Sequence, residues 1–495
     1  MKLGGRHGLI NLAMLFVSKA GGVLVVMFFM PLFFRILGAE QFGVVAVILS
    51  LQALLMMLDL GMSTMVGRDV AVYGSQATQS TTTWRNAEAI LTVFYIGIAV
   101  IAALSGTLGS LAGLSELSIV SVVGLFWALV LQNLGLSVLL SAKSFKAASA
   151  IQLIGALFRA GLTVIAMKQI DATLSIFITT QLITSLLQLW VTRWACANAL
   201  TSDLHVHKKI EYDLSGCVEL LKRGKSLLLF GLAGAAVMQL DKPIIATFIS
   251  ANEVSTYFLA VTFCMTPIAV LAGPVSQYFQ PHFISLVAQA SQKDSQQLLS
   301  KFVFVLVLIT AISSAALWFY RDFWIALWLH NNSSISVVIS YVTILLPGVV
   351  VGALGYIPYA LLTSQQDYYF QSILSTIMTT VTLALVVYFA DQKNIYAICW
   401  IYAFYHISST LLSWARAIVL LKTRAHALES FMFSMKLLMA IIIIAYLVKF
   451  ILSNIYVVHY EALVFMLIIS ILTIVSSVVY FKFDLRNKIH ATKVG

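Results

Sequence analysis

Five charged side chains lie inside long apolar stretches of this sequence, where an ionised group is costly. A charge near the centre of a lipid bilayer costs about 2.5–3.5 kcal/mol on insertion scales. Lysine and arginine make strong charge-assisted hydrogen bonds to phosphate oxygens, and burial lets a carboxylate change its charge near neutral pH. These residue types predict basic groups that face a hydrated cavity or a charged partner and a carboxylate that couples an ion, with structural ion pairing as the alternative. Three of them are basic and two are acidic: Lys19, Arg159 and Lys242, and Asp59 and Asp241.

The basic side chains are the candidates for substrate binding. Lys19 lies about nine residues into the apolar stretch 10–34, roughly 13 Å deep at 1.5 Å per residue. Arg159 lies near the middle of the stretch 149–167. Neither side chain reaches an interface easily, so each is predicted to face water or a charged partner. Lys242 is the third basic residue inside the predicted spans.

Prolines in the predicted spans predict hinges. Pro243 follows Asp241 and Lys242 directly, and it should break its helix and free backbone carbonyls beside two charges. Pro267 and Pro274 are spaced by seven residues, as are Pro274 and Pro281, so they fall near one helix face. Broken helices in transporters mark binding or coupling sites. We therefore predict hinges at Pro243, Pro267 and Pro274, with kinks that only improve packing as the alternative.

The carboxylates Asp241 and Asp59 are the predicted ion-coupling residues. Asp241 is the better candidate because it lies beside Pro243, where the helix can bend when the charge changes. Asp59 lies near one end of its apolar stretch, where helix capping or loop pairing competes with a coupling role.

Composition identifies the elements that must position these residues. Of the 495 residues, 61% are hydrophobic and only 10% are charged, and the mean hydropathy is +0.97. Soluble domains carry about 25% charged residues. The chain is therefore predicted to be an all-α polytopic membrane protein, with no room for a soluble domain of normal size. This excludes most soluble enzymes, DNA-binding proteins and secreted scaffolds, and the net charge of +11 is assigned to cytoplasmic loops rather than to nucleic-acid binding.

Apolar runs bounded by charged or turn residues predict about fourteen transmembrane helices. Basic connectors, 197–225 and 422–436, separate them into groups of six, six and two. When basic residues near the end of a span are counted with the adjoining side, 22 of the 30 Lys and Arg residues fall on one predicted side, 5 on the other and 3 in the interior of spans. This bias places both termini and residues 197–225 in the cytoplasm. The predicted spans are 10–34, 43–66, 87–108, 118–140, 149–167, 174–195, 226–249, 254–276, 302–320, 335–361, 370–389, 395–418, 437–452 and 461–481.

A short internal sequence repeat, called the echo below, supports two pseudo-symmetric lobes. Residues 37–42 (LGAEQF) join spans one and two, and residues 249–254 (ISANEV) join spans seven and eight at the same relative place. Six spans separate the copies, so the repeats insert in the same orientation, and substrate pathways in such proteins lie between the halves. We predict an N-lobe at 1–200, a C-lobe at 201–420, and spans thirteen and fourteen with a cytoplasmic tail at 421–495.

The sequence carries no signal for a metal or a cofactor. The four cysteines form no C-x-x-C pair, which argues against a zinc site or a disulfide framework. There is no G-x-x-x-x-G-K-[ST] phosphate loop, so we do not expect ATP as the direct energy source.

Two segments resemble a known family. Residues 34–43 (FRILGAEQFG), followed by 58–62 (LDLGM) and 68–69 (RD), are similar to the start of the Wzx-type O-antigen and polysaccharide repeat-unit flippases. These belong to the multidrug/oligosaccharidyl-lipid/polysaccharide (MOP) exporter superfamily. Residues 239–243 (QLDKP) and 254–257 (VSTY) are similar to a second family motif, although Ser255 stands where glycine is usual. The motifs cover the first 75 residues or so and 225–260.

The resemblance implies a two-lobed, V-shaped helical transporter in the inner membrane of a bacterium. Such a protein moves an undecaprenyl-pyrophosphate-linked oligosaccharide from the cytoplasmic to the periplasmic leaflet by alternating access. The implied partners are this lipid-linked substrate, membrane lipids, and a polysaccharide polymerase with its chain-length regulator. In the family, cationic cavity residues suit the pyrophosphate headgroup, as Lys19, Arg159 and Lys242 would here.

Three alternatives remain open at this point. The lipid II flippases of the same superfamily also have fourteen spans. A multidrug cation antiporter should have net acidic charge in its cavity, and the basic residues in the spans argue against it. A membrane polysaccharide polymerase usually needs a substantial periplasmic loop, but the largest predicted one, 321–334, is short. We therefore predict a transporter and not an enzyme.

Overall fold

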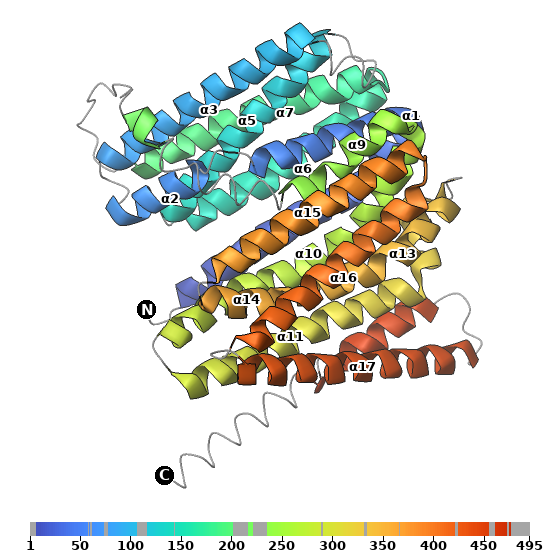
Figure 1. Ribbon diagram of the computed structural model, residues 1–495. Coiled ribbons are helices and arrows are strands. Elements are labelled where there is room, and N and C mark those ends of the chain that lie inside the picture. Colours follow the sequence, from blue (N-terminus) through green and yellow to red (C-terminus); the bar gives the residue numbers. More distant parts are fainter. Residues whose placement is uncertain are drawn as a thin grey trace. The chain divides into compact units, whose positions relative to one another are not determined.

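A computed structural model of the chain is helical throughout its described part (Figure 1). It describes residues 6–57, 59, 62–73, 78–105, 116–142, 144–200, 216–220, 235–288, 291–330, 334–365, 367–420, 424–454, 461–472 and 475–476. The predicted all-α class is confirmed. The labelled helices are α1 (Arg6–Met57), α2 (Met62–Tyr73), α3 (Thr78–Ser105), α5 (Glu116–Ser141), α6 (Phe145–Gln169), α7 (Leu174–Leu200), α9 (Asp241–Phe248), α10 (Ala251–Ala288), α11 (Gln292–Phe319), α12 (Arg321–Leu329), α13 (Ile335–Leu354), α14 (Tyr356–Ser364), α15 (Tyr368–Asp391), α16 (Ile395–Val419) and α17 (Arg424–Asn454).

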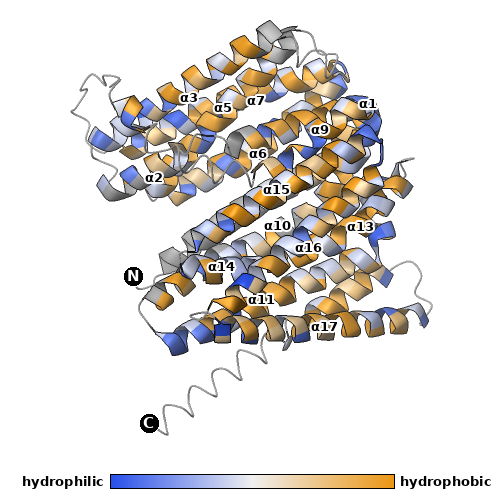
Figure 2. Cartoon of the chain, in the orientation of Figure 1, coloured by the Kyte–Doolittle hydropathy of each residue, from blue (hydrophilic) through white to orange (hydrophobic). Residues whose placement is uncertain are grey.

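Within the described residues, 10 helices are long and apolar enough to cross a membrane, or 11 if the bent α10 is counted as one span. Many large apolar side chains of these helices are exposed, as lipid contact requires, and the long helices are coloured mainly as hydrophobic (Figure 2). The chain is therefore a multi-pass membrane protein. The total of fourteen stays a prediction, because predicted spans seven and fourteen run into residues outside the described part.

The chain's contacts divide it into two compact units. The first unit is Met1–Leu259 with Thr379–Ile395, and the second unit is Ala260–Met378 with Tyr396–Gly495. The predicted boundaries at residues 200 and 420 concern sequence repeats rather than contacts, and they stay predictions.

A glycine separates the first two predicted spans within α1. Gly38 has φ 75° and ψ 168°, a backbone region that essentially only glycine adopts. In the second copy of the echo, Ile249 is extended between α9 and α10, with φ −124° and ψ 156°. The helix resumes at Ala39 in the first copy and at Ala251 in the second, which are equivalent positions. The echo in the sequence therefore has a counterpart in the local structure.

The first unit contains a bundle of α3, α5, α6 and α7 (Figure 1). Its centre is α5, which contacts α2, α3 and α7. In the most apolar part of α5, 72% of the residues are buried, whereas in the most apolar part of α6 only 17% are buried. The helix α6 packs instead between α1 and α7 and presents an apolar outer face. The bundle therefore holds α6 and α7 side by side, so side chains of the two helices contact each other.

The predicted second span, 43–66, is wrong at its end. The helix α1 stops at Met57, and a separate short helix, α2, begins at Met62 and packs on α5. The cause lies at Asp59, whose carboxylate Oδ2 accepts a hydrogen bond from the Ser63 backbone N–H at 3.0 Å. An aspartate that caps the next helix competes with continuation of the previous one.

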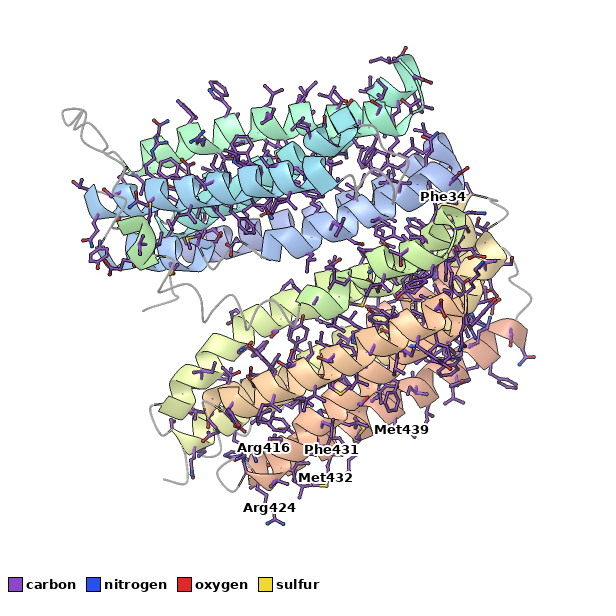
Figure 3. All side chains as sticks on the ribbon, turned by 45° about the horizontal axis from the view of Figure 1, so that its top comes forward. Phe34, Arg416, Arg424, Phe431, Met432 and Met439 are labelled. Atoms are coloured by element: carbon purple, nitrogen blue, oxygen red, sulfur yellow. The ribbon has the colours of Figure 1, made fainter. Side chains whose placement is uncertain are left out.

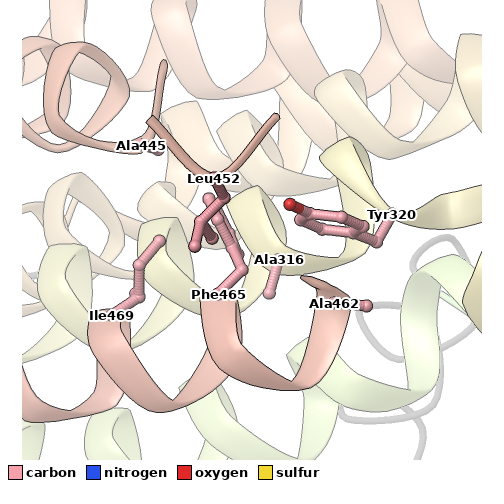
Figure 4. Close-up of a cluster of buried hydrophobic side chains, with 7 residues drawn as sticks. All are labelled: Ala316, Tyr320, Ala445, Leu452, Ala462, Phe465 and Ile469. Carbon is pink, nitrogen blue, oxygen red and sulfur yellow. The ribbon is translucent and has the colours of Figure 1, made fainter. Parts of the chain in front are cut away.

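In the second unit, the C-terminal helices pack on α11. The short helix Glu461–Leu472 and α17 enclose a hydrophobic cluster with the end of α11 (Figure 4). Beside it, Lys449 Nζ lies 2.9 Å from Glu461 Oε1, to which the Tyr320 hydroxyl donates at 3.0 Å. The cluster consists of Ala316, Tyr320, Ala445, Leu452, Ala462, Phe465 and Ile469.

The predicted connector 422–436 is wrong from Arg424 onward, because α17 begins there and contains Lys436. Its first turns are too polar to be found as an apolar run. They are amphipathic instead: Ala427, Ser430 and Ser434 are buried, whereas Met432 is 46% exposed and points outward (Figure 3). A helical period in a polar segment is the signal that would have found this turn.

Candidate substrate and coupling site

The most deeply buried charges among the predicted site residues form one cluster in the first unit. Asp241 is 1% exposed and Lys242 is 4% exposed. Lys242 Nζ lies 2.9 Å from Asp241 Oδ1 and also donates a hydrogen bond to the Met238 carbonyl at 3.2 Å. The hydroxyl of Tyr257, on α10, donates to Asp241 Oδ2 at 2.9 Å. We call Asp241, Lys242 and Tyr257 the charged trio.

A local helix break positions the charged trio. Residues 235–239 are helical, Leu240 is a bend, and α9 begins at Asp241. Pro243 is the third residue of α9, where its missing N–H cannot continue the preceding helix. The break predicted beside Pro243 is therefore present at Leu240, whereas the role of Pro243 as a hinge stays a prediction.

The ion pair changes how Lys242 must be regarded as a substrate ligand. Within the pair the two charges cancel, so Lys242 offers no net positive charge in this state. Removing one partner of a buried pair costs about 3–5 kcal/mol, because the other charge is left uncompensated. Lys242 can therefore bind an anion only if its contact with Asp241 is exchanged.

Arg159 has a different environment. It lies on α6, and its Nη1 donates a hydrogen bond to Ser185 Oγ on α7 at 3.3 Å. Within the described part of the chain, no carboxylate lies within 4.0 Å of its guanidinium. The guanidinium of Arg159 is thus hydrogen-bonded to a neutral hydroxyl. The described residues supply no counter-ion for it, and an anionic ligand would supply one.

Arg159 is one member of a row of polar groups between α6 and α7, which we call the polar seam. Gln181 Nε2 donates to Thr163 Oγ1 at 3.2 Å, and Gln188 Nε2 donates to the Ile151 carbonyl at 3.2 Å. From α5, the amide of Gln132 donates to the carbonyl of Ser185 at 2.6 Å. Hydrogen bonds between transmembrane helices contribute about 0.6 kcal/mol each on average.

Sequence reasoning found Arg159 but missed the rest of the polar seam. The signal was present on α7, where Gln181, Ser185 and Gln188 recur at a spacing of four and three residues. That spacing places three polar side chains on one face of an otherwise apolar helix. The members of the seam missed from the sequence are Gln132, Thr163, Gln181, Ser185 and Gln188.

The remaining predicted residues are scattered. Asp59 is 8% exposed and caps α2. Lys19 lies in α1 and Pro267 in α10, but their side chains lie outside the described part. The helix α10 bends by 43° between Ala251–Thr266 and Val270–Gln280, and Pro274 is buried beyond this bend.

Two of the predicted sites remain separate. No hydrogen bond or ion pair among the described residues joins Arg159 to the Asp241–Lys242 pair. The same part of the chain contains no group of three or more His, Cys, Asp or Glu side chains that could hold a metal ion.

The fold is shared with solved membrane transport proteins. The lipid II flippase MurJ, in its inward closed conformation, matches 96% of this chain and 100% of its own, with a TM-score of 0.73 and 12% identity. A multidrug resistance MATE family transporter of the MOP superfamily, facing inward, matches 85% of this chain and 94% of its own, with a TM-score of 0.62 and 14% identity. At these identities the likeness concerns the fold.

A third structure agrees. The Vibrio cholerae MATE transporter VcmN in its bent form matches 86% of this chain and 98% of its own, with a TM-score of 0.54 and 12% identity. The protein is therefore an α-helical membrane protein of the MOP transporter fold.

The sequence also matches a family. Residues 32–302 match the polysaccharide biosynthesis protein family, and because this match covers more than half of the chain, the protein belongs to that family. Comparison with curated protein sequences finds no match. The family resemblance noted in residues 34–69 and 239–257 agrees with this match, and the fold is shared with a transporter of the MOP superfamily.

Proposed function

We propose that the protein is a flippase that moves an undecaprenyl-pyrophosphate-linked oligosaccharide repeat unit of O-antigen or a similar surface polysaccharide. The movement runs from the cytoplasmic to the periplasmic leaflet of a bacterial inner membrane by alternating access. The observation that carries the proposal is membership of the polysaccharide biosynthesis family in a chain with the fold of a lipid flippase. A polymerase and its chain-length regulator would then act on the delivered unit.

Arg159 is the proposed main ligand of the pyrophosphate headgroup. Its described partner is a neutral hydroxyl, so binding a phosphate oxygen replaces a weak contact with a charge-assisted one. The amides and hydroxyls of the polar seam flank it and supply donors and acceptors suited to neighbouring sugar hydroxyls. Lys19 is proposed as a second cationic ligand on α1.

Lys242 and Asp241 are proposed to act together by exchange. Protonation of Asp241 removes the negative charge 2.9 Å from Lys242 Nζ and releases the ammonium to an anionic ligand. Conversely, a phosphate oxygen on Lys242 favours the protonated carboxyl. The contact between Asp241 and Lys242 therefore couples binding of a proton to binding of the substrate. Pro243 is proposed as the point at which α9 bends when the protonation of Asp241 changes. Asp59, which caps α2, is the weaker coupling candidate.

The wider machinery follows the repeat pattern. We propose lobes at 1–200 and 201–420 with two further helices at 421–495, both termini in the cytoplasm, and hinges at Pro267 and Pro274 in α10. Transport, rather than catalysis on the sugar, is the proposed activity.

Deletion of the gene tests the proposal. A strain without the protein should lose its surface polysaccharide and accumulate the lipid-linked unit on the cytoplasmic leaflet, while growth and peptidoglycan remain normal. Normal polysaccharide in the deletion strain would refute the proposal. Arrest of cell-wall synthesis would assign lipid II as the substrate instead.

Complementation of the same strain tests the headgroup site. Arg159→Ala should be present in the membrane at the wild-type level yet restore no polysaccharide, whereas Arg159→Lys should restore part of it, because lysine keeps the charge. Full activity of Arg159→Ala would remove Arg159 from the site.

A further inference from the structure

Two arginines from different helices share one buried carboxylate in the first unit. Arg193, on α7, contacts Glu88, on α3, through two hydrogen bonds: Nε to Oε1 at 3.0 Å and Nη2 to Oε2 at 2.8 Å. Arg85 Nη1 reaches Glu88 Oε2 at 3.3 Å, and its guanidinium lies over the Trp84 ring, 4.6 Å from the centroid. We call Arg85, Glu88 and Arg193 the arginine cluster.

The arginine cluster presents positive charge outward. The Glu88 side chain is only 6% exposed, whereas those of Arg85 and Arg193 are 28% and 43% exposed. Two guanidiniums against one carboxylate leave a net charge of +1. Glu88 thus fixes both guanidiniums in place while both arginine side chains stay partly exposed, as a preorganised anion site requires.

Helix length places the arginine cluster at the edge of the hydrocarbon layer. From Leu174, where α7 begins, to Arg193 is a stretch of twenty residues, about 30 Å at 1.5 Å per residue. From Arg85 to Ser105, where α3 ends, is nearly the same length. The hydrocarbon core of a bilayer is about 30 Å thick. The helices α3 and α7 are antiparallel, and in each the arginine lies about one hydrocarbon thickness from the far end of the helix. Both arginines are therefore placed at the same headgroup level.

Neighbouring side chains agree with that level. Trp190 and Trp194, one turn apart beside Arg193, are 70% and 62% exposed, and exposed tryptophans gather at the membrane interface. Eleven residues, or about three turns, beyond Arg85 on α3, Ile96 is 58% exposed on the same face. The surface below the cluster is therefore apolar and open to acyl chains.

We propose that the arginine cluster binds the phosphate of an anionic phospholipid in the cytoplasmic leaflet. The basic-residue bias assigns this end of both helices to the cytoplasm. A singly charged phosphodiester matches the net charge of +1, and the apolar faces of α3 and α7 accommodate its acyl chains. This lipid is a resident ligand and not the transported molecule, so the inference does not depend on the transport proposal.

Binding to lipids of defined headgroup tests the inference. The full chain, purified in a neutral detergent, is titrated with phosphatidylglycerol or phosphatidylcholine, and bound lipids are counted by native mass spectrometry. Wild type should prefer phosphatidylglycerol. Arg85→Gln keeps the Arg193–Glu88 contacts but removes the net charge, and should bind phosphatidylglycerol about fivefold more weakly. Lys146→Gln is the matched control, because Lys146 is exposed on the same predicted side, and it should bind like wild type.

A second variant moves binding in the opposite direction. Glu88→Gln raises the net charge of the cluster to +2, so it should bind phosphatidylglycerol about fivefold more tightly even though it lowers thermal stability. A merely structural cluster would lose stability without this gain. Equal binding of both lipids by wild type, or Arg85→Gln indistinguishable from Lys146→Gln, overturns the proposal. Full competition by glycerol phosphate would assign the site to a soluble phosphate and overturn its lipid source.

Discussion

The two copies of the repeated turn between helices, at 37–42 and 249–254, have similar backbone breaks, but the helices that flank them differ in charge. Counted from Gly38 in the first copy and Ser250 in the second, Pro31 and Pro243 each lie seven residues earlier. The positions that correspond to the charged trio are apolar in the first copy. Where the second copy has Asp241, Lys242 and Tyr257, the first has Phe29, Met30 and Val45.

This difference shows whether the turn requires the charged trio in order to form. Met30 and Val45 are 5% and 0% exposed and Phe29 is half-buried, so the first copy packs at these positions without any charge. Replacing a buried ion pair by well-packed apolar residues is often neutral or stabilising. The turn therefore does not need the charged trio to form, and its presence in only one copy favours a role in transport.

The two turns also touch each other within the first unit. A Cβ atom on Gly43 would lie 1.8 Å from the Ala251 carbonyl oxygen, so the two backbones meet there with no room for a side chain. The rings of Phe42 and Phe258 pack nearby at 5.9 Å between centroids. Glycine is needed at this contact because of close approach and not because of its φ angle.

The largest expected effect comes from removing half of the ion pair. Lys242→Met leaves the Asp241 charge buried and should lower the free energy of unfolding by about 3–5 kcal/mol. Asp241→Leu combined with Lys242→Met makes the second turn apolar like the first and should recover most of that loss. Thermal and denaturant unfolding in detergent measure both variants.

The double variant should nevertheless restore no surface polysaccharide in the deletion strain. If it is as unstable as Lys242→Met, the charges are needed for folding and the comparison between the turns fails. If it is stable and fully active, the charged trio has no part in transport.

A smaller loss is expected at the contact between the turns. Gly43→Ala inserts a methyl group against the Ala251 backbone and should destabilise the protein by about 1–3 kcal/mol, the usual cost of overpacking. Gly161→Ala on α6 is the control, since nothing lies within 4 Å of a Cβ built there, and it should be neutral or slightly stabilising. Equal unfolding midpoints for the two variants would contradict the close contact.

A loss of about the same size as that of Gly43→Ala is expected from one hydroxyl. Tyr257→Phe removes the donor to Asp241 Oδ2 and should cost about 1.5–3 kcal/mol, the range for hydrogen bonds to charged groups. Tyr405→Phe is the control, because no hydrogen bond to the Tyr405 hydroxyl occurs among the described residues, and it should change stability little. Because the ion pair remains, Tyr257→Phe should keep partial transport. An unchanged unfolding midpoint would show that the hydroxyl does not stabilise the carboxylate.

Much of the fold could be predicted because a bilayer leaves the backbone few choices. Every backbone polar group in lipid must be satisfied within its own segment, so long apolar runs become helices. Glycine and proline then mark interruptions, as Gly38 and Pro243 do here. Interruptions made by a side chain were harder to predict: Asp59 ends the second span through a cap, and the polar first turns of α17 carry no apolar run.

The sequence by itself determined the membrane class, the helix breaks at Gly38 and beside Pro243, the family motifs and the identity of the charges inside the spans. Only the tertiary structure decided which partner each charge has. Glu88 and Arg193 meet across 105 residues, Gln132 reaches Ser185 across 53, and Tyr257 reaches Asp241 across 16. The reason is physical: backbone hydrogen bonding in lipid is local and can be read from composition, whereas side-chain pairing depends on how each helix rotates and slides against its neighbours.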